Sequence, residues 1–255
     1  MGSGAVLWDI LSRSPTLESV VIDQNSRLIA VYRVVQTAVD ALIAALSDLQ
    51  GRYWAMAPEA RSAMYYAVRD AFNQCDGTNV HQAAQFIFLN RTGFNGLYRV
   101  NRRGQFNVPM GRYQQPTICD PLALQQTHDA LQRVTLLAGD YHQAARYAGP
   151  QTFVYLDPPY RPLSATASFT AYNAGAFTDD DQRQLAQFVQ GLDKDGTQFL
   201  LSNADPHNTD PHDHFFDTLY HEFHRVRVPA RRTINSQASG RGSIHELLIH
   251  NFPTR

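Results

Sequence analysis

The chain has 255 residues, of which 44% are hydrophobic and 18% are charged, and its formal net charge is −1. This composition supports a buried core and excludes global disorder, because disordered chains combine low hydrophobicity with high net charge. Two cysteines make no disulfide framework, no apolar run approaches the roughly 18 residues of a membrane span, and no signal peptide is visible. We therefore expect a cytoplasmic protein.

Helix, strand and helix are predicted in the first part of the chain. Residues 5–11 are helix-like, and Ser19–Ile22 predict a short strand that ends at Asp23-Gln-Asn25. Apolar residues from Leu28 to Leu49 recur at spacings of 3 and 4, which predicts one long amphipathic helix. The pattern stays helical over residues 57–89. Residues 90–112, rich in Gly, Asn and Arg, then predict a loop or hairpin.

Strands alternate with helices in the second half. A helix is predicted over residues 121–137, and Thr152–Leu156 predict a strand closed by Asp157-Pro-Pro-Tyr160. Thr178 opens a helix, residues 198–201 predict a strand ending at Ser202-Asn203, and residues 225–228 and 246–249 predict two final strands. The alternation predicts an α/β parallel sheet with an inserted, mainly helical subdomain. Ligands of such sheets bind at the carboxyl ends of the strands, where the polar segments fall.

Positive charge is concentrated in two segments that contain no acidic residue. These segments cover residues 78–118 and 223–245, and their arginines are Arg91, Arg99, Arg102, Arg103, Arg112, Arg225, Arg227, Arg231, Arg232 and Arg241. Two positive segments on a nearly neutral chain are typical of a protein that contacts phosphate backbones. The alternative is a solvated face of an arginine-rich protein.

The Asp157-Pro158-Pro159-Tyr160 segment predicts a site for an aromatic amine. The prolines stiffen the backbone, so the Asp157 carboxylate and the following carbonyl form two fixed acceptors for one exocyclic amine. Such acceptors free the nitrogen lone pair, and the Tyr160 ring can stack on a planar base. A proline-rich strand exit without a function is the alternative.

The N-terminal glycines predict a cofactor site. Gly2 and Gly4 precede a helix, and Asp23 directly follows the next strand, about 20 residues after the glycines, the spacing at which an acidic group accepts bonds from ribose hydroxyls. An NAD enzyme has the same layout, but Leu7 takes the place of the third glycine.

Together these segments resemble the Dam-type DNA adenine-N6 methyltransferases of the D12 class, with the motifs in the α-class order. The most specific likeness is residues 88–101 and 106–113, which look like the target-recognition hairpin of that family. Asp157-Pro-Pro-Tyr160 with residues 162–170 looks like its catalytic loop, and residues 201–203, 232–235 and 246–249 also match.

The resemblance implies a Rossmann-like fold, S-adenosylmethionine as methyl donor, no metal, and double-stranded DNA as substrate of a monomeric enzyme. It implies that Asp157, Pro158 and Tyr160 are catalytic and that Tyr160 stacks on an extruded adenine. Gly2, Gly4, Asp23 and Asp157 would line the cofactor site. Phe94 would wedge between bases, Arg99 would read a guanine edge, and the implied target is GATC-like. The implied DNA contacts are Phe94, Asn95, Arg99, Pro109 and Arg112.

The resemblance also predicts the domain organisation. Residues 1–55 and 148–255 would form the catalytic domain, and residues 56–147 the helical recognition subdomain with its hairpin at 90–113. The family begins with a Lys-Trp-Ala-Gly-Gly-Lys segment over the cofactor and a strand that ends in Glu-Pro-Phe. The sequence starts after both, so we expect a missing first strand, weak cofactor binding and low stability.

Two other functions stay open. A truncated remnant would still bind DNA but would transfer no methyl group. RNA, protein-glutamine and cytosine-N4 methylation also use Asn/Asp-Pro-Pro-Tyr segments, but the hairpin signature argues against them.

Five histidines crowd residues 207–224 at spacings that fit no standard zinc pattern, so we predict no metal there.

Overall fold

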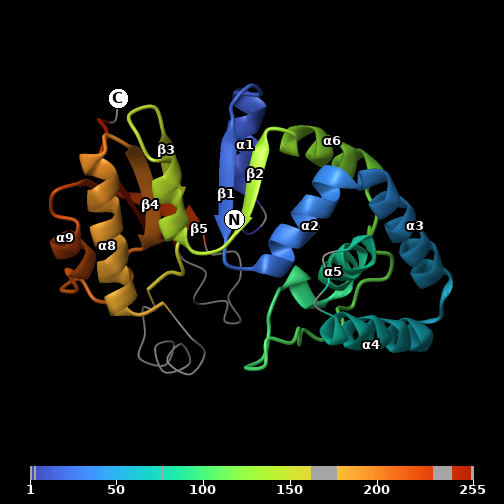
Figure 1. Ribbon diagram of the computed structural model, residues 1–255. Coiled ribbons are helices and arrows are strands. Elements are labelled where there is room, and N and C mark those ends of the chain that lie inside the picture. The colour runs from blue at the N-terminus through green and yellow to red at the C-terminus, as the bar shows by residue number, and fades with distance from the viewer. Residues whose placement is uncertain are drawn as a thin grey trace. The chain divides into compact units, whose positions relative to one another are not determined.

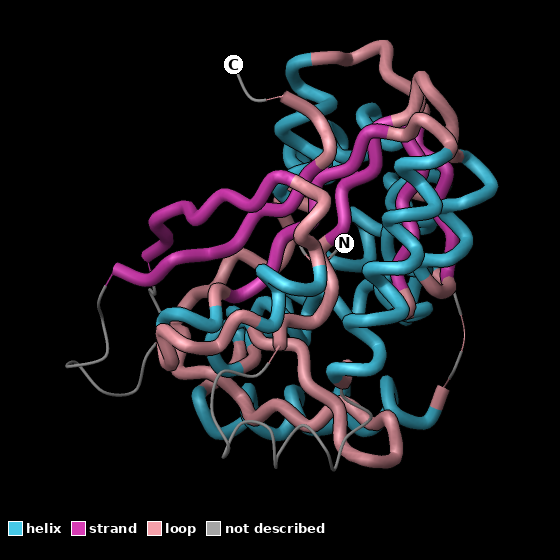
Figure 2. The backbone as a smooth tube through the Cα atoms, turned by 90° about the vertical axis from the view of Figure 1, so that its left-hand side faces the viewer, coloured by secondary structure: helices cyan, strands magenta, loops and turns pink. Residues whose placement is uncertain are grey.

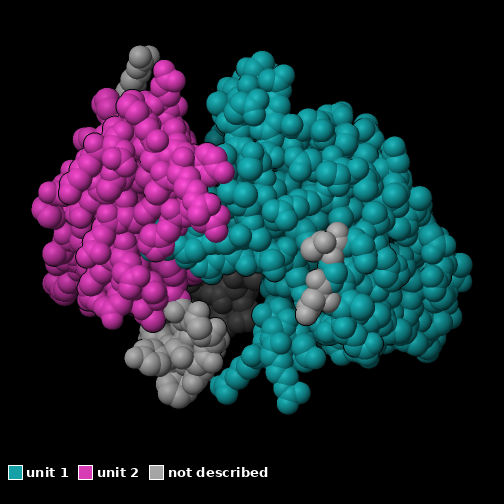
Figure 3. All heavy atoms as spheres, in the orientation of Figure 1, with its two compact units in different colours: residues 1–141 teal, residues 142–255 magenta. Residues whose placement is uncertain are grey.

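The computed structural model describes residues 2, 4–75, 77, 79–161, 177–231 and 243–253. Predicted motif residues 162–170 and 232–235 lie outside the described residues. The chain divides into two compact units, residues 1–141 and 142–255, which Figure 3 shows in different colours. The sequence-based boundaries at residues 55, 56, 147 and 148 stay a prediction.

Unit 1 is mainly helical, with one pair of parallel strands (Figure 1). Its elements are α1 (Ala5–Arg13), β1 (Ser19–Asp23), α2 (Ser26–Thr37), α3 (Val39–Ala55), α4 (Pro58–Gln74), α5 (Val80–Thr92), the 3-10 turn η1 (Phe94–Gly96), α6 (Pro121–Leu131) and β2 (Val134–Ala138). The core is built on fully buried side chains of α2, α3, α4 and α5. They include Ile29, Leu42, Leu46, Tyr53, Tyr65 and Phe88.

The single long helix predicted between Leu28 and Leu49 is wrong. The helix breaks at Ala38, and α2 and α3 meet at a bend of 111°. Neither proline nor glycine marks the break. With the bend, α2 packs against α5, α6 and the two strands, and α3 packs mainly against α5. Among the described residues no single helix is long and apolar enough to cross a membrane, although α2 and α3 taken as a bent pair are.

The helix predicted over residues 121–137 is wrong beyond Leu131. Residues Val134–Ala138 form β2, which pairs in parallel with β1. Arg33 and Gln36 of α2 donate to the β2 carbonyls of Leu136 and Val134. The β-branched pair Val134-Thr135 favours a strand, and the partner strand β1 lies more than 100 residues earlier in the chain.

Unit 2 carries a four-stranded sheet. After the 3-10 turn η2 (Tyr141–Tyr147), the elements are β3 (Phe153–Leu156), α8 (Asp179–Lys194), β4 (Gln198–Ala204), the 3-10 turn η3 (Pro206–Asn208), α9 (Phe215–Leu219), β5 (His224–Arg231) and β6 (Ser243–His250). The strand order is β3-β4-β6-β5. The predicted parallel pairing holds for β3 and β4, whereas β6 is antiparallel to both of its neighbours, so the sheet of unit 2 is mixed. Figure 2 shows its strands in magenta.

Helix α8 begins with the predicted capping box. The Thr178 hydroxyl accepts from the Asp181 backbone, and the Asp181 carboxylate accepts from the Thr178 backbone. Leu185, Val189 and Leu192 are buried on one face of α8, which packs against β4. Strand β4 continues through Ser202 and Asn203, which pair with β6, rather than ending before them as predicted.

Candidate functional site

The Asp157–Tyr160 loop follows β3 directly, at the carboxyl end of that strand. In the parallel register Leu156 lies opposite Leu201, so the next residue, Asp157, comes level with Ser202 of β4. Ser202 is buried, and its Oγ donates to Asp157 Oδ1 at 3.1 Å. The exposed Asp157 carboxylate is therefore oriented by a hydrogen bond from the buried Ser202 side chain of the neighbouring strand.

A buried amide pair bonds to the backbone of the same loop. Asn203 and Gln182 are fully buried. Asn203 Oδ1 accepts from the Arg161 backbone N–H at 3.1 Å, and Asn203 Nδ2 donates to Gln182 Oε1 at 3.3 Å. Gln182 Nε2 in turn donates to the Pro159 carbonyl at 3.3 Å. The loop backbone is thus bonded to β4 and α8 on the carboxyl side of Pro158, which is half-buried.

Arg161 ties the end of the loop to two further elements. Its Nε and Nη2 donate to the two carboxylate oxygens of Asp179 at 2.8 and 3.1 Å, and its Nη1 donates to Asp213. The guanidinium lies 4.3 Å from the ring centre of Phe215 in α9. Hydrogen bonding to Asp179 raises the pKa of Arg161 above its usual value despite the opposing effect of burial. Sequence reasoning did not single out Arg161, because its partners lie 18 and 52 residues away.

Tyr160 keeps its proton at neutral pH. Burial raises the pKa of its hydroxyl, the hydrogen bond with Ser202 lowers it, and the charges of Glu246 and Asp157 raise it again, so that the pKa lies above its ordinary value. The residue is 38% exposed. Part of this neutral ring is therefore open to a planar partner.

In unit 1, two of the predicted cofactor residues, Gly2 and Asp23, interact with Tyr32. The Tyr32 hydroxyl donates to the Gly2 carbonyl at 3.1 Å, and burial together with the charge of Asp23 raises the pKa of Tyr32 to about 12. Gly4 begins α1 with φ +73°, and a Cβ there would lie 2.8 Å from Trp8 Nε1. Gly4 therefore has to be glycine, both for its backbone conformation and for the close indole.

Two acidic residues stand at the carboxyl ends of β1 and β2. Asp23 is the last residue of β1 and lies opposite Ala138. The Gly139 N–H donates to the Asp23 carbonyl at 3.0 Å, and Gln24 Nε2 donates to Asp140 Oδ2 at 3.0 Å. Both carboxylates are half-buried. This places two acceptors at one edge of a parallel pair, which is the edge where such sheets bind ligands.

Sequence reasoning missed Asp140 because it took the preceding residues for a helix. The signal was present: Val134–Leu137 is a short apolar run with a β-branched start, closed by glycine and an acid. Ser19–Ile22 followed by Asp23 has the same layout and was identified as a strand.

The predicted hairpin forms in unit 1. Antiparallel bridges join Gly93 to Met110 and Val100 to Phe106. A Cβ at Gly93 would lie 2.5 Å from the Leu89 carbonyl oxygen, so only glycine allows the chain to leave α5 at this angle. The prediction of a hairpin is confirmed, although its pairing is limited to isolated bridges.

Helix α4 supports the returning arm of the hairpin. Phe106 and Val108 are buried, and the Tyr65 hydroxyl donates to the Val108 carbonyl at 2.9 Å. The Asn73 side chain donates to the Phe106 carbonyl at 3.0 Å and accepts from its N–H at 2.8 Å. The returning arm of the hairpin is therefore bonded to α4 at residues 106 and 108.

The outgoing arm and the turn of the hairpin present predicted nucleic-acid residues to solvent. Residues 94–104 are all exposed, Phe94 at 48%. Asn95 adopts a left-handed conformation with φ +53°, and the Pro109 carbonyl accepts from the Phe94 N–H at 2.9 Å. Arg112 is exposed as well. An aromatic ring and several arginines thus share one exposed segment without any acid.

Arg99 is oriented within the hairpin. Its Nε donates to Asn107 Oδ1 at 2.8 Å, and its Nη2 donates to the Asn107 carbonyl at 3.1 Å. This leaves other guanidinium N–H groups for a planar acceptor. Asn107 was not predicted as a site residue, although it lies in the quoted motif.

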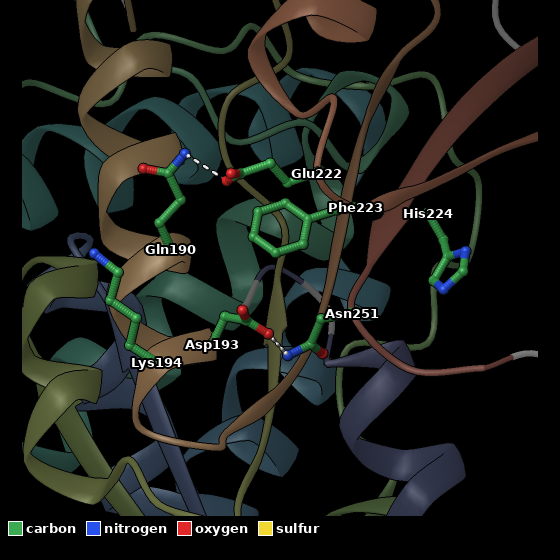
Figure 4. Close-up of a pocket in the computed structure, with 7 residues that line it drawn as sticks. All are labelled: Gln190, Asp193, Lys194, Glu222, Phe223, His224 and Asn251. Carbon is green, nitrogen blue, oxygen red and sulfur yellow. Dashed lines mark hydrogen bonds between the residues drawn. The ribbon is translucent and has the colours of Figure 1, made fainter.

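The pocket shown in Figure 4 lies elsewhere in unit 2. Its volume is about 520 Å³, and it is lined by Gln190, Asp193, Lys194, Glu222, Phe223, His224 and Asn251. These residues come from the end of α8, the start of β5 and the end of β6, near the amino end of β4. The pocket therefore opens at the edge opposite to Asp157 and contains none of the predicted site residues.

Comparison with known proteins gives matches over nearly the whole chain. Residues 1–234 match the family model described as D12 class N6 adenine-specific DNA methyltransferase. The chain is 44% identical to Type II methyltransferase M.MjaIII of Methanocaldococcus jannaschii, over 99% of the chain and 86% of that protein.

Two further relatives match nearly as large a share of the chain. Type II methyltransferase M1.LlaDCHI of Lactococcus lactis subsp. cremoris is 33% identical over 99% of the chain and 84% of its own length. The DNA adenine methylase of Escherichia coli K12 is 35% identical over 90% of the chain and 77% of its own length. The likeness extends over both units.

Proposed function

The chain belongs to the D12 class of N6 adenine-specific DNA methyltransferases, and we propose that it methylates N6 of an extruded adenine within a GATC-like site of duplex DNA. The observation that carries the proposal is the oriented Asp157 carboxylate. Ser202 fixes it, while Asn203 and Gln182 fix the backbone that follows.

In the proposed mechanism, Asp157 increases the nucleophilicity of the adenine N6 amine. The N6 lone pair is delocalised into the ring, so the amine is a weak nucleophile. A carboxylate that accepts one N6 hydrogen, together with the Pro158 carbonyl accepting the other, favours a tetrahedral nitrogen with a localised lone pair. As the new N–C bond forms and the sulfur–methyl bond of the donor breaks, N6 becomes positive, and the Asp157 charge stabilises that change. The N6 proton then leaves to solvent.

The residues of unit 1 fit S-adenosylmethionine by their chemistry. Asp23 and Asp140 are acceptors suited to ribose hydroxyls and an exocyclic amine, and the α1 N-terminus behind Gly4 offers backbone N–H groups. When bound, this group supplies an electrophilic methyl on a sulfonium centre. The proposed contacts of this group are Gly2, Gly4 and Asp23 in unit 1, and Asp157 is the contact proposed in unit 2.

Base extrusion follows from where N6 lies, because a paired adenine is inaccessible inside the duplex. The part-exposed, neutral Tyr160 ring offers a stacking surface for the extruded adenine. Phe94 is the exposed aromatic residue beside the Gly93–Met110 bridge of the hairpin, and we propose that it enters the space between base pairs. Asn95, Pro109 and Arg112 contact the duplex beside it.

Arg99 is the proposed base reader. Its contact with Asn107 holds the guanidinium plane in one orientation, which a bidentate bond to a guanine edge requires. Such an enzyme acts as a monomer in the cytoplasm. Because two relatives carry type II methyltransferase names, protection of DNA against a partner nuclease is its proposed role.

The test is transfer of radiolabelled methyl from S-adenosylmethionine to duplexes with and without a GATC site. We expect N6-methyladenine in the GATC duplex only, and its loss in Asp157→Ala. Activity retained in Asp157→Ala would overturn the assigned mechanism. Salt-sensitive DNA binding without methyl transfer by the wild-type chain would support a binding protein instead.

A further inference from the structure

Two histidines and one aspartate of unit 2 converge beyond the end of β4. His207 lies on η3, His214 is the residue before α9, and Asp217 lies within α9. His207 Nε2 is 3.5 Å and His214 Nδ1 is 3.8 Å from the same oxygen, Asp217 Oδ2. All three atoms lie within 4.8 Å of one another.

Local capping interactions bring these side chains together. The Asp205 carboxylate accepts from the His207 N–H at 3.2 Å and starts the 3-10 turn, and the Asp213 carboxylate accepts from the Phe215 N–H at 3.0 Å and starts α9. Asp217 follows His214 by three residues, so both face the same side of that short helix. The spacing of seven and three residues is not a known zinc signature, which is why the sequence predicted no metal.

The donor set is the one that borderline divalent metals prefer. Two imidazole nitrogens and a carboxylate oxygen bind Zn²⁺ at about 2.0–2.2 Å, which puts neighbouring ligand atoms about 3.3 Å apart. The distances of 3.5 and 3.8 Å to Asp217 Oδ2 are close to that value. Small side-chain rotations therefore suffice to complete three protein ligands around one ion.

An orphaned nitrogen points to the same ligand. His207 Nε2 is buried and has no hydrogen-bond partner among the described residues. A buried unsatisfied nitrogen is costly, and a metal ion satisfies it directly. The His214 side chain is 62% exposed, which leaves the fourth position of the ion open to water.

The charges around the cluster limit its affinity for a cation. Asp205 and Asp217 pair with Arg225 and Arg227, and Asp213 pairs with Arg161, so three carboxylates face three guanidinium groups. Arg227 Nη2 already donates to Asp217 Oδ2 at 2.8 Å. The arginine orients this carboxylate and competes with the ion, which implies weaker binding than at a closed four-ligand zinc site.

We propose that His207, His214 and Asp217 form a site for one divalent transition-metal ion of the Zn²⁺ type. Its place in the fold indicates a structural role. The segment that carries the ligands also carries Asp213, the partner of Arg161 at the end of the Asp157–Tyr160 loop. An ion that joins η3 to α9 stiffens the elements to which that loop is bonded.

The test uses the full chain after treatment with a chelator, in a Cys75→Ser background, because the exposed Cys75 thiol would bind zinc on its own. Titration with ZnCl2 by calorimetry is expected to show one ion per chain and a raised melting temperature. CoCl2 is expected to give the visible absorption of low-coordinate Co²⁺ with imidazole ligands.

His207→Gln and His214→Gln are expected to weaken Zn²⁺ binding by more than about tenfold and to abolish the melting shift. The matched controls are His212→Gln and His221→Gln, which alter histidines of the same segment outside the cluster and are expected to bind as the parent does. Because His214 is exposed, its variant tests the site without disturbing the core. The proposal would be overturned if the parent did not bind one Zn²⁺ per chain, or if the His207 and His214 variants bound Zn²⁺ as tightly as the parent does.

Discussion

Ser202 Oγ donates a hydrogen bond to Asp157 Oδ1 at 3.1 Å, across the parallel pair formed by β4 and β3. Ser202 lies one residue beyond the last pair of β3 and β4, Leu156 with Leu201, where the chain leaves β3 and enters the Asp157–Tyr160 loop. The position of the carboxylate is therefore set by the register of two strands.

We expect Ser202→Ala to lower kcat about 10- to 100-fold with little change in KM for DNA, because a misaligned Asp157 costs orientation rather than binding. A double-mutant cycle with Asp157→Asn is the decisive measurement. If Ser202 acts through Asp157, Ser202→Ala has almost no further effect in the Asp157→Asn enzyme. Additive losses would show that Ser202 only supports the fold.

Arg161→Met is expected to lower the free energy of unfolding by about 1–2 kcal/mol and to reduce kcat, since it frees the loop end from Asp179 and Asp213. Arg183→Met is a matched control, because Arg183 lies over the same Phe215 ring but pairs with the exposed Asp180. Its effect is expected below about 0.5 kcal/mol. Urea unfolding and steady-state kinetics measure both, and equal effects would contradict a specific role for Arg161.

Arg99→Ala is expected to remove about 1–3 kcal/mol of discrimination between a GATC duplex and one with its guanine replaced. Asn107→Ala is expected to act in the same direction, because Asn107 orients Arg99. Arg102→Ala is the comparison, because Arg102 is exposed and is expected to contact the phosphate backbone. Its loss is expected to weaken binding to both duplexes equally and to reduce the slope of log K against log salt concentration by about one. A uniform loss in Arg99→Ala would refute base reading.

Alkaline pH is expected to destabilise the hairpin support through Tyr65. Burial raises the pKa of Tyr65 to about 12 in the folded chain, against about 10 when unfolded. The stabilisation is therefore complete below pH 10 and is lost as the pH rises through 12, by up to about 1.4 kcal/mol per pH unit.

Tyr65→Phe is expected to flatten this pH dependence in urea unfolding. At pH 8 it is also expected to cost about 1–3 kcal/mol, because the buried Val108 carbonyl loses its donor. Tyr66→Phe, at the exposed neighbouring position, is expected to change neither quantity. An unchanged alkaline slope in Tyr65→Phe would contradict the assignment.

Local rules predicted the elements whose signals are local. The capping box at Thr178, the strand before Asp157 and the hairpin between Gly93 and Met110 are all present. The failures are of another kind. Ala38 breaks a helix without a breaker residue, and Val134–Ala138 form a strand within a predicted helix, because packing against distant segments overrides local preference.

The sequence by itself determined the family of this protein: the Asp157–Tyr160 loop, the acid after the first strand and the arginine-rich hairpin are contiguous motifs, and their order already resembles the family that the chain belongs to. Only the tertiary structure decided which residues complete them. Ser202, Gln182 and Arg161 act on the loop across 18 to 52 residues of sequence, Asp140 stands beside Gln24, and His207 meets Asp217. The physical reason is that a motif is read along the chain, whereas hydrogen bonds and ligand sets form wherever strand register and helix packing bring side chains within about 3 Å.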